Sequence, residues 1–495
     1  MTRLSLATLH QLAGPVRLPA YDPAALDIGI VHLGLGAFHR AHQAVYTDDV
    51  LASDSRWGIL GASLRAADTR DALQPQDGLY TLAVRDASGE ALRVIGAIRG
   101  IVVAPEDPAA LLRAMCSPQV RIVSLTVTEK GYCHDPATGE LNEEHPDIRH
   151  DLTHPDAPRS APGFLARALH ERRRLGIAPF TILCCDNLPA NGRTVRKVVT
   201  SFATLLDAAF GTWTGATVAF PCTMVDRIVP ATTDADRARI SAALGVDDAW
   251  PAVTEPFSQW IIEDQFPQGR PAWAAIFVTG VEPFEHMKLR LLNGAHSSLA
   301  YLGYLSGHET VADAMADPAL ARYVALLMRD EAAPSLKLPP GIDVEAYKAD
   351  LFARFRNPAL AHRTWQIAMD GSQKLPQRLL GTARDLLAAG RSIDGVALGV
   401  AAWMRYVTGI DEKGNAIDVR DPLRDDLRRR ADAAGLDAAA LAPALLAVDR
   451  VFGSDLPHNN HFTSAVTTAL DSLIRHGARE TLKRFRRSPT PSARR

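Results

Sequence analysis

The feature that most constrains the fold is an apolar segment followed by a glycine turn and an amphipathic stretch. Residues Ile28–Leu35 are predicted to form a buried strand, which Gly34 and Gly36 end, and Phe38–Ala52 is predicted to form a helix. Strands separated by helical stretches indicate β-α-β units and a largely parallel sheet. Further strands are predicted at Trp57–Leu64, Ile122–Val127, Phe180–Cys185, Ala216–Phe220 and Ala274–Val278.

The sequence changes character near residue 280. From Met287 onward strand signals are few, whereas Ala and Leu, which favour helices, are abundant. We therefore predict an α/β domain over residues 1–279 and an all-helical domain over residues 280–495. Helices are expected at Leu289–Leu305, Pro318–Asp330, Val344–Phe355, Ser392–Val407 and Leu441–Phe452.

Composition argues against several classes of protein. The 54 basic and 56 acidic residues give a net charge of −2, so no global basic surface points to nucleic acid. The five cysteines form no C-x-x-C pair, which predicts neither a zinc framework nor a disulfide scaffold. No signal peptide or apolar run of about 18 residues is present, so we expect a cytoplasmic protein away from membranes. The basic stretch Lys483–Arg495 is expected to be a solvated tail.

The glycine turn is a candidate site for a dinucleotide. Gly34 can make a tight turn, and Gly36 lets a pyrophosphate approach the start of the following helix, at Ala37 and Phe38. His39 stands where the usual third glycine would be. A bare G-x-G can also be a structural turn, but the order of strand, turn and helix favours the dinucleotide.

The residues that would choose between NAD and NADP leave the choice open. Trp57–Leu64 ends without an acidic residue, and Asp68 follows it. Asp68 would favour NAD by accepting from the ribose hydroxyls, whereas Arg65 or Arg70 could neutralise a 2′-phosphate. Glu129, in the segment after a predicted strand, could border the nicotinamide ribose. Ordinary solvated loops are the alternative in both places.

Polar residues that suit hydride transfer follow near residue 288. Reduction of a carbonyl needs a proton donor and donors that stabilise the developing alkoxide. On an α-helix Lys288 and His296 lie within an arc of about 80°, with Asn293 just outside it. Asn187, beyond a predicted strand, lies where α/β folds place ligands. The alternative for the segment with Lys288 and His296 is an amphipathic surface helix, and the alternative for Asn187 is an ordinary turn residue.

Several segments together resemble the mannitol dehydrogenase family, the polyol-specific long-chain dehydrogenases, over nearly the whole chain. The resemblance implies a Rossmann-type N-terminal domain, a mostly α-helical C-terminal domain, a nicotinamide cofactor and no catalytic metal. It also implies that Lys288 is the general acid/base, that Asn187 and Asn293 hold the oxyanion, and that His296 orients the substrate. Glu285 is similar to a glutamate that aids proton movement. The segments are Gly34–Gln43, Thr126–Tyr132, Cys185–Asn187, Met224–Arg227 and Lys288–His296.

Within the family, the sequence is most similar to the fructuronate reductase (D-mannonate oxidoreductase) branch. This implies reversible NAD(H)-dependent reduction of D-fructuronate to D-mannonate. Arg363, Lys374 or Arg378 could pair with the uronate carboxylate. The alternative is that these residues are solvated or domain-bridging charges. Asp226 is a further candidate for substrate binding, or half of a salt bridge with Arg227. The phrases that carry this resemblance are Phe220–Pro230, Arg363–Pro376 and Gly414–Val419.

Two alternatives remain open at this point. One is a dehydrogenase of the same family that acts on mannitol and fructose, or on arabinitol. The other is a nucleotide-sensing protein that has kept the fold without catalysis, although all four catalytic positions hold competent residues. The substrate, the choice of NADP instead of NAD, and a monomeric or dimeric state are not fixed by the sequence.

Overall fold

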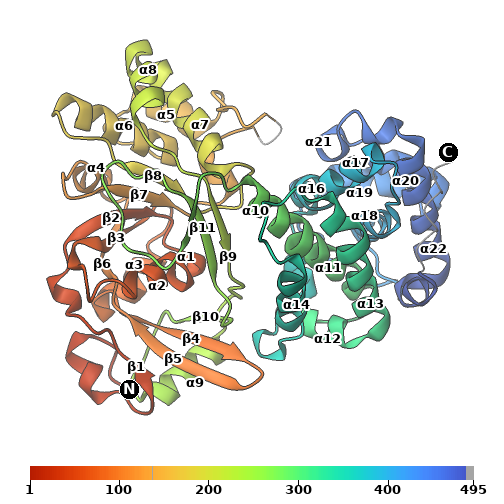
Figure 1. Cartoon of the computed structure of the whole chain (residues 1–495), viewed down its shortest axis with the longest axis horizontal. Helices are drawn as coiled ribbons and strands as arrows, with labels where there is room; N and C mark the ends of the chain where they lie inside the picture. The colour runs from red at the N-terminus through yellow and green to blue at the C-terminus, as the bar shows by residue number, and fades with distance from the viewer. Residues whose placement is uncertain (136–137, 486–495) are drawn as a thin grey trace. The chain divides into compact units, whose positions relative to one another are not determined.

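The computed structural model describes residues 1–135 and 138–485, and the chain divides into two compact units, Met1–Glu282 and Pro283–Arg495 (Figure 1). Most of the predicted basic tail, residues 486–495, lies outside the described residues. Among those that are described, we find no helix whose length and hydropathy would let it cross a bilayer.

A five-stranded parallel sheet forms the centre of the first unit, and this confirms the predicted Rossmann-type fold. Its central strand is β2, which carries the glycine turn. Successive residues of β2 point to opposite faces: Ile30 packs in one hydrophobic core, whereas Val31 and Leu33 pack in another. In sheet order the strands are β6 (Ile98–Val103), β3 (Gly58–Ser63), β2 (Ile28–Leu33), β7 (Ile122–Leu125) and β8 (Thr181–Cys184).

Helices cover this sheet. The core on the Val31 side includes residues of α4, α6 and α7, and the core on the Ile30 side includes residues of α2. The helices of the unit are α1 (Ala37–Ala41), α2 (Gln43–Asp48), α3 (Asp68–Leu73), α4 (Pro108–Met115), α5 (Pro146–Thr153), α6 (Ala161–Arg174), α7 (Asn191–Leu206), α8 (Ala208–Thr217) and α9 (Asp234–Leu244).

Two predictions for this unit were wrong. The helix expected over Phe38–Ala52 is two short helices, because the backbone of His42 leaves helical geometry between them (φ −124°, ψ −92°). The strand expected at Ala216–Phe220 is absent, and its first two residues end α8. Two smaller sheets were missed, although the strand predicted at Ala274–Val278 forms one of their strands and a local antiparallel hairpin forms two others. They are β1 (Val16–Arg17), β5 (Gly89–Ile95), β4 (Tyr80–Asp86) and β10 (Ala252–Thr254), and β12 (Ile276–Val278), β11 (Gln259–Glu263) and β9 (Thr223–Asp226).

The second unit is mostly helical, as predicted. The helix predicted at Val344–Phe355 matches α14 at both ends. Its α-helices are α10 (Glu282–Met287), α11 (Ala295–Leu305), α12 (Val311–Ala316), α13 (Pro318–Leu326), α14 (Val344–Phe355), α15 (Thr364–Ala368), α16 (Gly371–Leu375), α17 (Gly381–Ala388), α18 (Asp394–Val407), α19 (Arg424–Ala434), α20 (Ala438–Leu446), α21 (Asp449–Phe452) and α22 (Asn460–Arg484).

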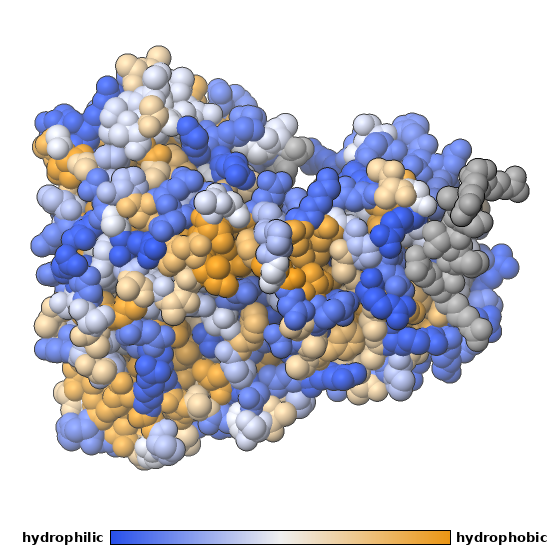
Figure 2. Space-filling view, in the orientation of Figure 1, coloured by the Kyte–Doolittle hydropathy of each residue, from blue (hydrophilic) through white to orange (hydrophobic). Residues whose placement is uncertain are grey.

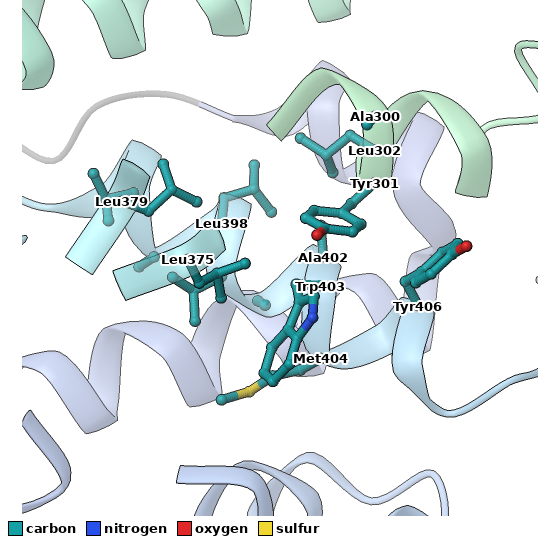
Figure 3. Packing of buried hydrophobic residues seen from close by; sticks show 14 of the residues in the cluster. Ala300, Tyr301, Leu302, Leu375, Leu379, Leu398, Ala402, Trp403, Met404 and Tyr406 are labelled. Atoms are coloured by element: carbon teal, nitrogen blue, oxygen red, sulfur yellow. The ribbon is translucent and has the colours of Figure 1, made fainter. Parts of the chain in front are cut away.

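The core of this unit forms around α11 and α18. Both helices are buried over nearly their whole length, and their aromatic and aliphatic side chains lie together (Figure 3). Tyr301 and Trp403 are fully buried there. On the face drawn in Figure 2, hydrophilic side chains cover much of the surface and apolar ones gather in smaller patches.

Candidate active site

The glycine turn at the end of β2 is held by its neighbours. Gly34 has φ +93°, and a Cβ there would lie 2.2 Å from the Thr126 carbonyl oxygen, so no other residue fits without a shift. Its amide donates to the Ala62 carbonyl at 2.8 Å, and its carbonyl accepts from the Thr126 hydroxyl at 2.7 Å. The turn is therefore fixed to the ends of the two strands that flank β2.

Gly36 has open space beside its Cα, whereas the Cα of Gly34 is closely packed against the neighbouring backbone. It caps α1 in an extended conformation (φ −88°), is exposed, and the nearest atom to a Cβ would be the Gly34 carbonyl oxygen at 3.9 Å. Ala37 and Phe38 follow as half-buried residues of the first turn. This open space at the exposed cap of α1 suits a pyrophosphate group.

His39, at the place of the missing third glycine, packs against the strand with its ring. Its imidazole is stacked on that of His32 in β2, with ring centroids 3.5 Å apart, and both side chains are fully buried. Burial lowers the pKa of His32 to about 3, and burial and His32 lower the pKa of His39 well below 6.5. A stack of two neutral rings thus occupies the position where a glycine usually lets helix and strand approach.

The residues considered for the adenosine ribose lie on the surface. Asp68 is the first residue of α3 and is exposed, as is Arg65. Arg70 forms ion pairs with Glu106 and Asp71. Its charge is therefore compensated within the protein, which leaves Arg65 as the arginine to consider for a 2′-phosphate.

Asn187 is exposed just beyond β8, whereas its neighbour Asp186 organises the surrounding loops. The Asp186 carboxylate accepts from the backbone amides of Val127 (2.8 Å) and Thr128 (3.2 Å) and from the Tyr132 hydroxyl (2.6 Å). It thereby holds the turn that contains Glu129, an exposed residue, against the end of β8.

Asp186 and Asn191 were missed by the sequence analysis. Burial raises the pKa of Asp186 to about 6. The Asn191 side chain is buried and joins two segments: its amide nitrogen donates to the Cys184 and Thr223 carbonyls, and its oxygen accepts from the Thr223 amide. A run of polar residues directly after a buried strand is the signal that could have identified both.

Asp226 is buried at the end of β9. Its neighbour Arg227 donates to the backbone carbonyls of Ala41 (2.6 Å) and Glu255 (3.0 Å), so this arginine supports the main chain around the end of α1. Burial lowers the pKa of Arg227 to about 10.

Lys288 and Asn293 lie on a π-helical segment, η6 (Lys288–Gly294), which interrupts the α-helix between α10 and α11. The regular α-helix assumed for the predicted arc is therefore not formed over these residues. A π-helix forms hydrogen bonds from residue i to i+5, so residues five apart, such as Lys288 and Asn293, come one turn apart. Both side chains are buried, and the Asn293 amide oxygen has no hydrogen-bond partner among the described residues.

His296, on the first turn of α11, is buried in a positively charged environment. Its ring stacks on Phe355 with centroids 5.2 Å apart and meets His362 edge-on at 5.1 Å. Burial lowers its pKa well below 6.5, and four cationic or basic groups reinforce the shift. These groups are His362, Arg378, Arg354 and Lys374.

Three positions around His296 were not singled out from the sequence, namely Arg354, Phe355 and His362. Arg363 was expected to face a substrate, but it is exposed, whereas His362 beside it meets the ring of His296. Lys374 is half-buried and donates to the Met369 carbonyl at 2.5 Å, and Arg378 donates to the Ser297 hydroxyl at 3.0 Å. The half-buried Glu285 lies on α10, one turn before Lys288.

Comparison with known proteins places the chain in a family. A model described as the mannitol dehydrogenase Rossmann domain matches residues 28–275, and one described as the mannitol dehydrogenase C-terminal domain matches residues 280–474. The chain belongs to the mannitol dehydrogenase family. The members of this family are NAD-dependent oxidoreductases that act on CH–OH groups of polyols or sugar acids, and this chain is one of them.

Relatives of the chain carry different names. The D-mannonate oxidoreductase of Escherichia coli (strain K12) is 49% identical over 475 residues, which cover 94% of this chain and 97% of that protein. An uncharacterized oxidoreductase of the same strain, YeiQ, is also 49% identical over 475 residues, covering 94% and 96%. The solved structure of Pseudomonas fluorescens mannitol 2-dehydrogenase, a ternary complex with NAD and D-mannitol, has 42% identity and a TM-score of 0.91, covering 97% of this chain and 99% of that one.

The candidate residues of this mannitol dehydrogenase family enzyme belong to both units. The first unit holds the open glycine turn and Asn187. The second unit groups Lys288, Asn293 and His296 within nine consecutive residues, and the charges of Arg378, Arg354 and Lys374 lower the pKa of the histidine. A buried amine, a buried amide and a neutral imidazole are chemically suited to donate a proton to, and to hold, the oxygen of a carbonyl group.

Proposed function

We propose that this enzyme catalyses the reversible NAD(H)-dependent reduction of D-fructuronate to D-mannonate. The observation that carries the proposal is the set of cationic groups around His296. The positive charges of Arg378, Arg354 and Lys374 each help to lower the pKa of the His296 ring. A uronate carries a carboxylate that a polyol lacks, and cations of this kind stabilise a carboxylate. The 49% identity to a D-mannonate oxidoreductase supports the same substrate.

In the proposed reaction NADH, when bound, supplies a hydride to the ketone carbon, and a proton must reach the ketone oxygen. Lys288 is the proposed donor of that proton, and it regains one from solvent, with Glu285 as an auxiliary group. Asn293 and Asn187 are proposed to donate amide hydrogens to the oxygen as negative charge develops on it. His296, kept neutral by burial and by its cationic neighbours, is proposed to orient the substrate by a hydrogen bond.

The proposed cofactor residues are Gly34, Gly36, Ala37 and Phe38 at the turn, with Asp68 and Glu129 for the two ribose groups. The space beside Gly36, the exposed cap of α1, fits the pyrophosphate. Asp226, Lys374 and Arg363 are the proposed substrate residues, with Arg363 ranked last because it is exposed. We also propose functional domains at residues 1–279 and 280–495, for cofactor binding and for substrate chemistry. A cytoplasmic location stays a prediction.

A mannitol 2-dehydrogenase activity is the second candidate, and the similarity to the Pseudomonas fluorescens enzyme favours it. The deciding experiment measures oxidation of NADH and of NADPH with D-fructuronate, D-tagaturonate, D-fructose and D-xylulose. We expect the largest kcat/KM with NADH and fructuronate. Faster turnover of fructose than of either uronate would replace the proposal by this second candidate. NADH binding without oxidation by any of the four sugars would favour a nucleotide-sensing protein.

A further inference from the structure

Three metal-ligating side chains meet in the first unit at a place that the proposed reaction does not use. The thiol sulfur of Cys133, a ring nitrogen of His145 and a carboxylate oxygen of Asp147 all lie within 4.8 Å of one another. Cys133 is buried, and the other two side chains are half-buried. The set therefore combines one soft, one intermediate and one hard donor in a partly shielded position.

The backbone around the cluster is built to bring these residues together. The chain doubles back after Cys133, because the Asn142 amide donates to the Cys133 carbonyl at 2.9 Å and the His145 amide donates to the Asn142 carbonyl at 3.0 Å. His145 then caps α5, whose first turn contains Asp147. Cys133 itself has a left-handed backbone (φ 51°, ψ 38°), which is costly for a residue other than glycine and is found where the surroundings enforce it.

We propose that Cys133, His145 and Asp147 bind one divalent cation of the zinc class. Zinc accepts sulfur, nitrogen and oxygen donors, whereas magnesium and calcium prefer sites made of oxygen alone. Metal–ligand distances of about 2.0–2.3 Å in a tetrahedral site require donor atoms about 3.3–3.7 Å apart. Contraction of the cluster by about 1 Å, within reach of side-chain rotation, satisfies this requirement. A water molecule would complete the fourth position.

The cation would brace the same turn that Asp186 holds. Cys133 directly follows the short 3₁₀ helix η5 (Glu129–Tyr132), and Tyr132 is one of the donors to Asp186. Metal binding would thus tie η5 to the start of α5 and strengthen the turn that carries Glu129. The hydride transfer proposed above uses no metal, so this site is a structural one. It went undetected in the sequence because the spacing C-x₁₁-H-x-D is not one of the familiar zinc patterns.

The test uses the full-length protein, stripped with a chelator and titrated with Co²⁺ as a spectroscopic probe and then with Zn²⁺. We expect one Co²⁺ per chain, a thiolate-to-cobalt charge-transfer band in the near ultraviolet, and displacement of the band by Zn²⁺. Cys133→Ser should abolish the band. His145→Asn should weaken binding at least tenfold, and asparagine can still cap α5. Cys116→Ser, a half-buried thiol outside the cluster, is the matched control and should leave the band intact.

Absence of the band in the wild-type protein, or its persistence in Cys133→Ser, would overturn the proposal. Circular dichroism of each variant establishes whether it folds, and the wild-type titration decides the matter even if a variant does not. A second measurement is the thermal midpoint, which Zn²⁺ should raise in the wild-type protein and in Cys116→Ser but not in Cys133→Ser. Neither readout depends on the identity of the sugar substrate.

Discussion

Tyr132 donates its hydroxyl hydrogen to the carboxylate of Asp186 at 2.6 Å, and this bond joins the turn after β7 to the turn after β8. The same carboxylate accepts two backbone amides, those of Val127 and Thr128. Asn187 follows directly in the chain, so the proposed oxyanion amide is attached to a residue that three hydrogen bonds hold in place. Asp186 is a positioning residue in this arrangement.

Asp186→Asn should lower the free energy of unfolding by about 1–3 kcal/mol, because an amide offers one acceptor oxygen where the carboxylate offers two. Burial raises the pKa of Asp186 to about 6 in the folded protein, above its ordinary value of 3.8. The folded state therefore binds the proton more tightly. The stabilisation from this proton is complete below pH 3.8 and is lost as the pH rises through 6.

The wild-type protein should thus lose stability relative to Asp186→Asn between pH 4 and pH 6, by on the order of 2 kcal/mol. Urea unfolding of both proteins at pH 4, 5, 6 and 7 measures this difference. Parallel pH profiles would show that Asp186 does not titrate in this range. Tyr132→Phe provides the control, since it removes one donor and keeps the carboxylate.

Gly34→Ala and Gly36→Ala form a matched pair. The first places a Cβ 2.2 Å from a carbonyl oxygen at a left-handed φ, so it should destabilise the protein by at least about 2 kcal/mol. The second meets open space at an ordinary φ. Gly36→Ala should therefore keep the wild-type thermal midpoint but weaken NADH binding, measured by fluorescence titration, because its methyl group enters the space proposed for the pyrophosphate. Unchanged NADH affinity in Gly36→Ala would argue against that placement.

The architecture could be predicted from the sequence where local pattern and tertiary environment agree. The strands at Ile28, Ile122 and Thr181 are buried on both faces, so they are largely apolar runs, and α14 is a regular amphipathic helix. The sheet that contains β4 and β5 was missed for two reasons. These two strands form a hairpin across Ala87 and Ser88, a local signal that went unread. Its outer strands, β1 and β10, pair from distant segments, and no local pattern specifies such pairings.

The residue types of the candidate site could be predicted from the sequence. The helix type of the segment that carries them, and the side chains around them, could not. Nothing in the sequence near Lys288 indicates a π-helix, because helical winding depends on what packs around the segment. The groups around His296 include the cations Arg354 and Lys374 and the ring of His362, whose pKa burial lowers to about 4. The chain supplies these groups from 58 to 78 residues further on. A single sequence does not show that His362, and not Arg363, meets this ring. The roles assigned to these residues stay predictions.

Lys288→Met should reduce kcat for ketone reduction by about 10²–10⁴-fold, the usual contribution of a general acid. The substitution retains the length of the buried side chain and removes its proton. NADH affinity should change little, because the proposed nucleotide residues belong to the first unit. Stopped-flow reduction and NADH titration separate the two effects. Lys337→Met, at an exposed lysine of the same unit, is the control and should retain wild-type turnover. Comparable turnover in the two variants would remove Lys288 from the mechanism.

His296 should act as a neutral group over the working pH range, since burial and then its cationic neighbours hold its pKa well below 6.5. A depressed pKa in the folded state contributes stability that is present above pH 6.5 and is lost as the pH falls towards the folded pKa. His296→Gln removes this titration, so the wild-type protein should lose stability relative to the variant between pH 6.5 and pH 5, by at most about 1.4 kcal/mol per pH unit. Urea unfolding followed by circular dichroism measures the difference, with His476→Gln, at an exposed histidine, as the control. If the pH–rate profile for reduction has an acid limb, that limb should lie at the same pH in wild type and His296→Gln, because the proposed proton donor is Lys288. A displaced limb in His296→Gln would show that the imidazole itself changes charge during turnover.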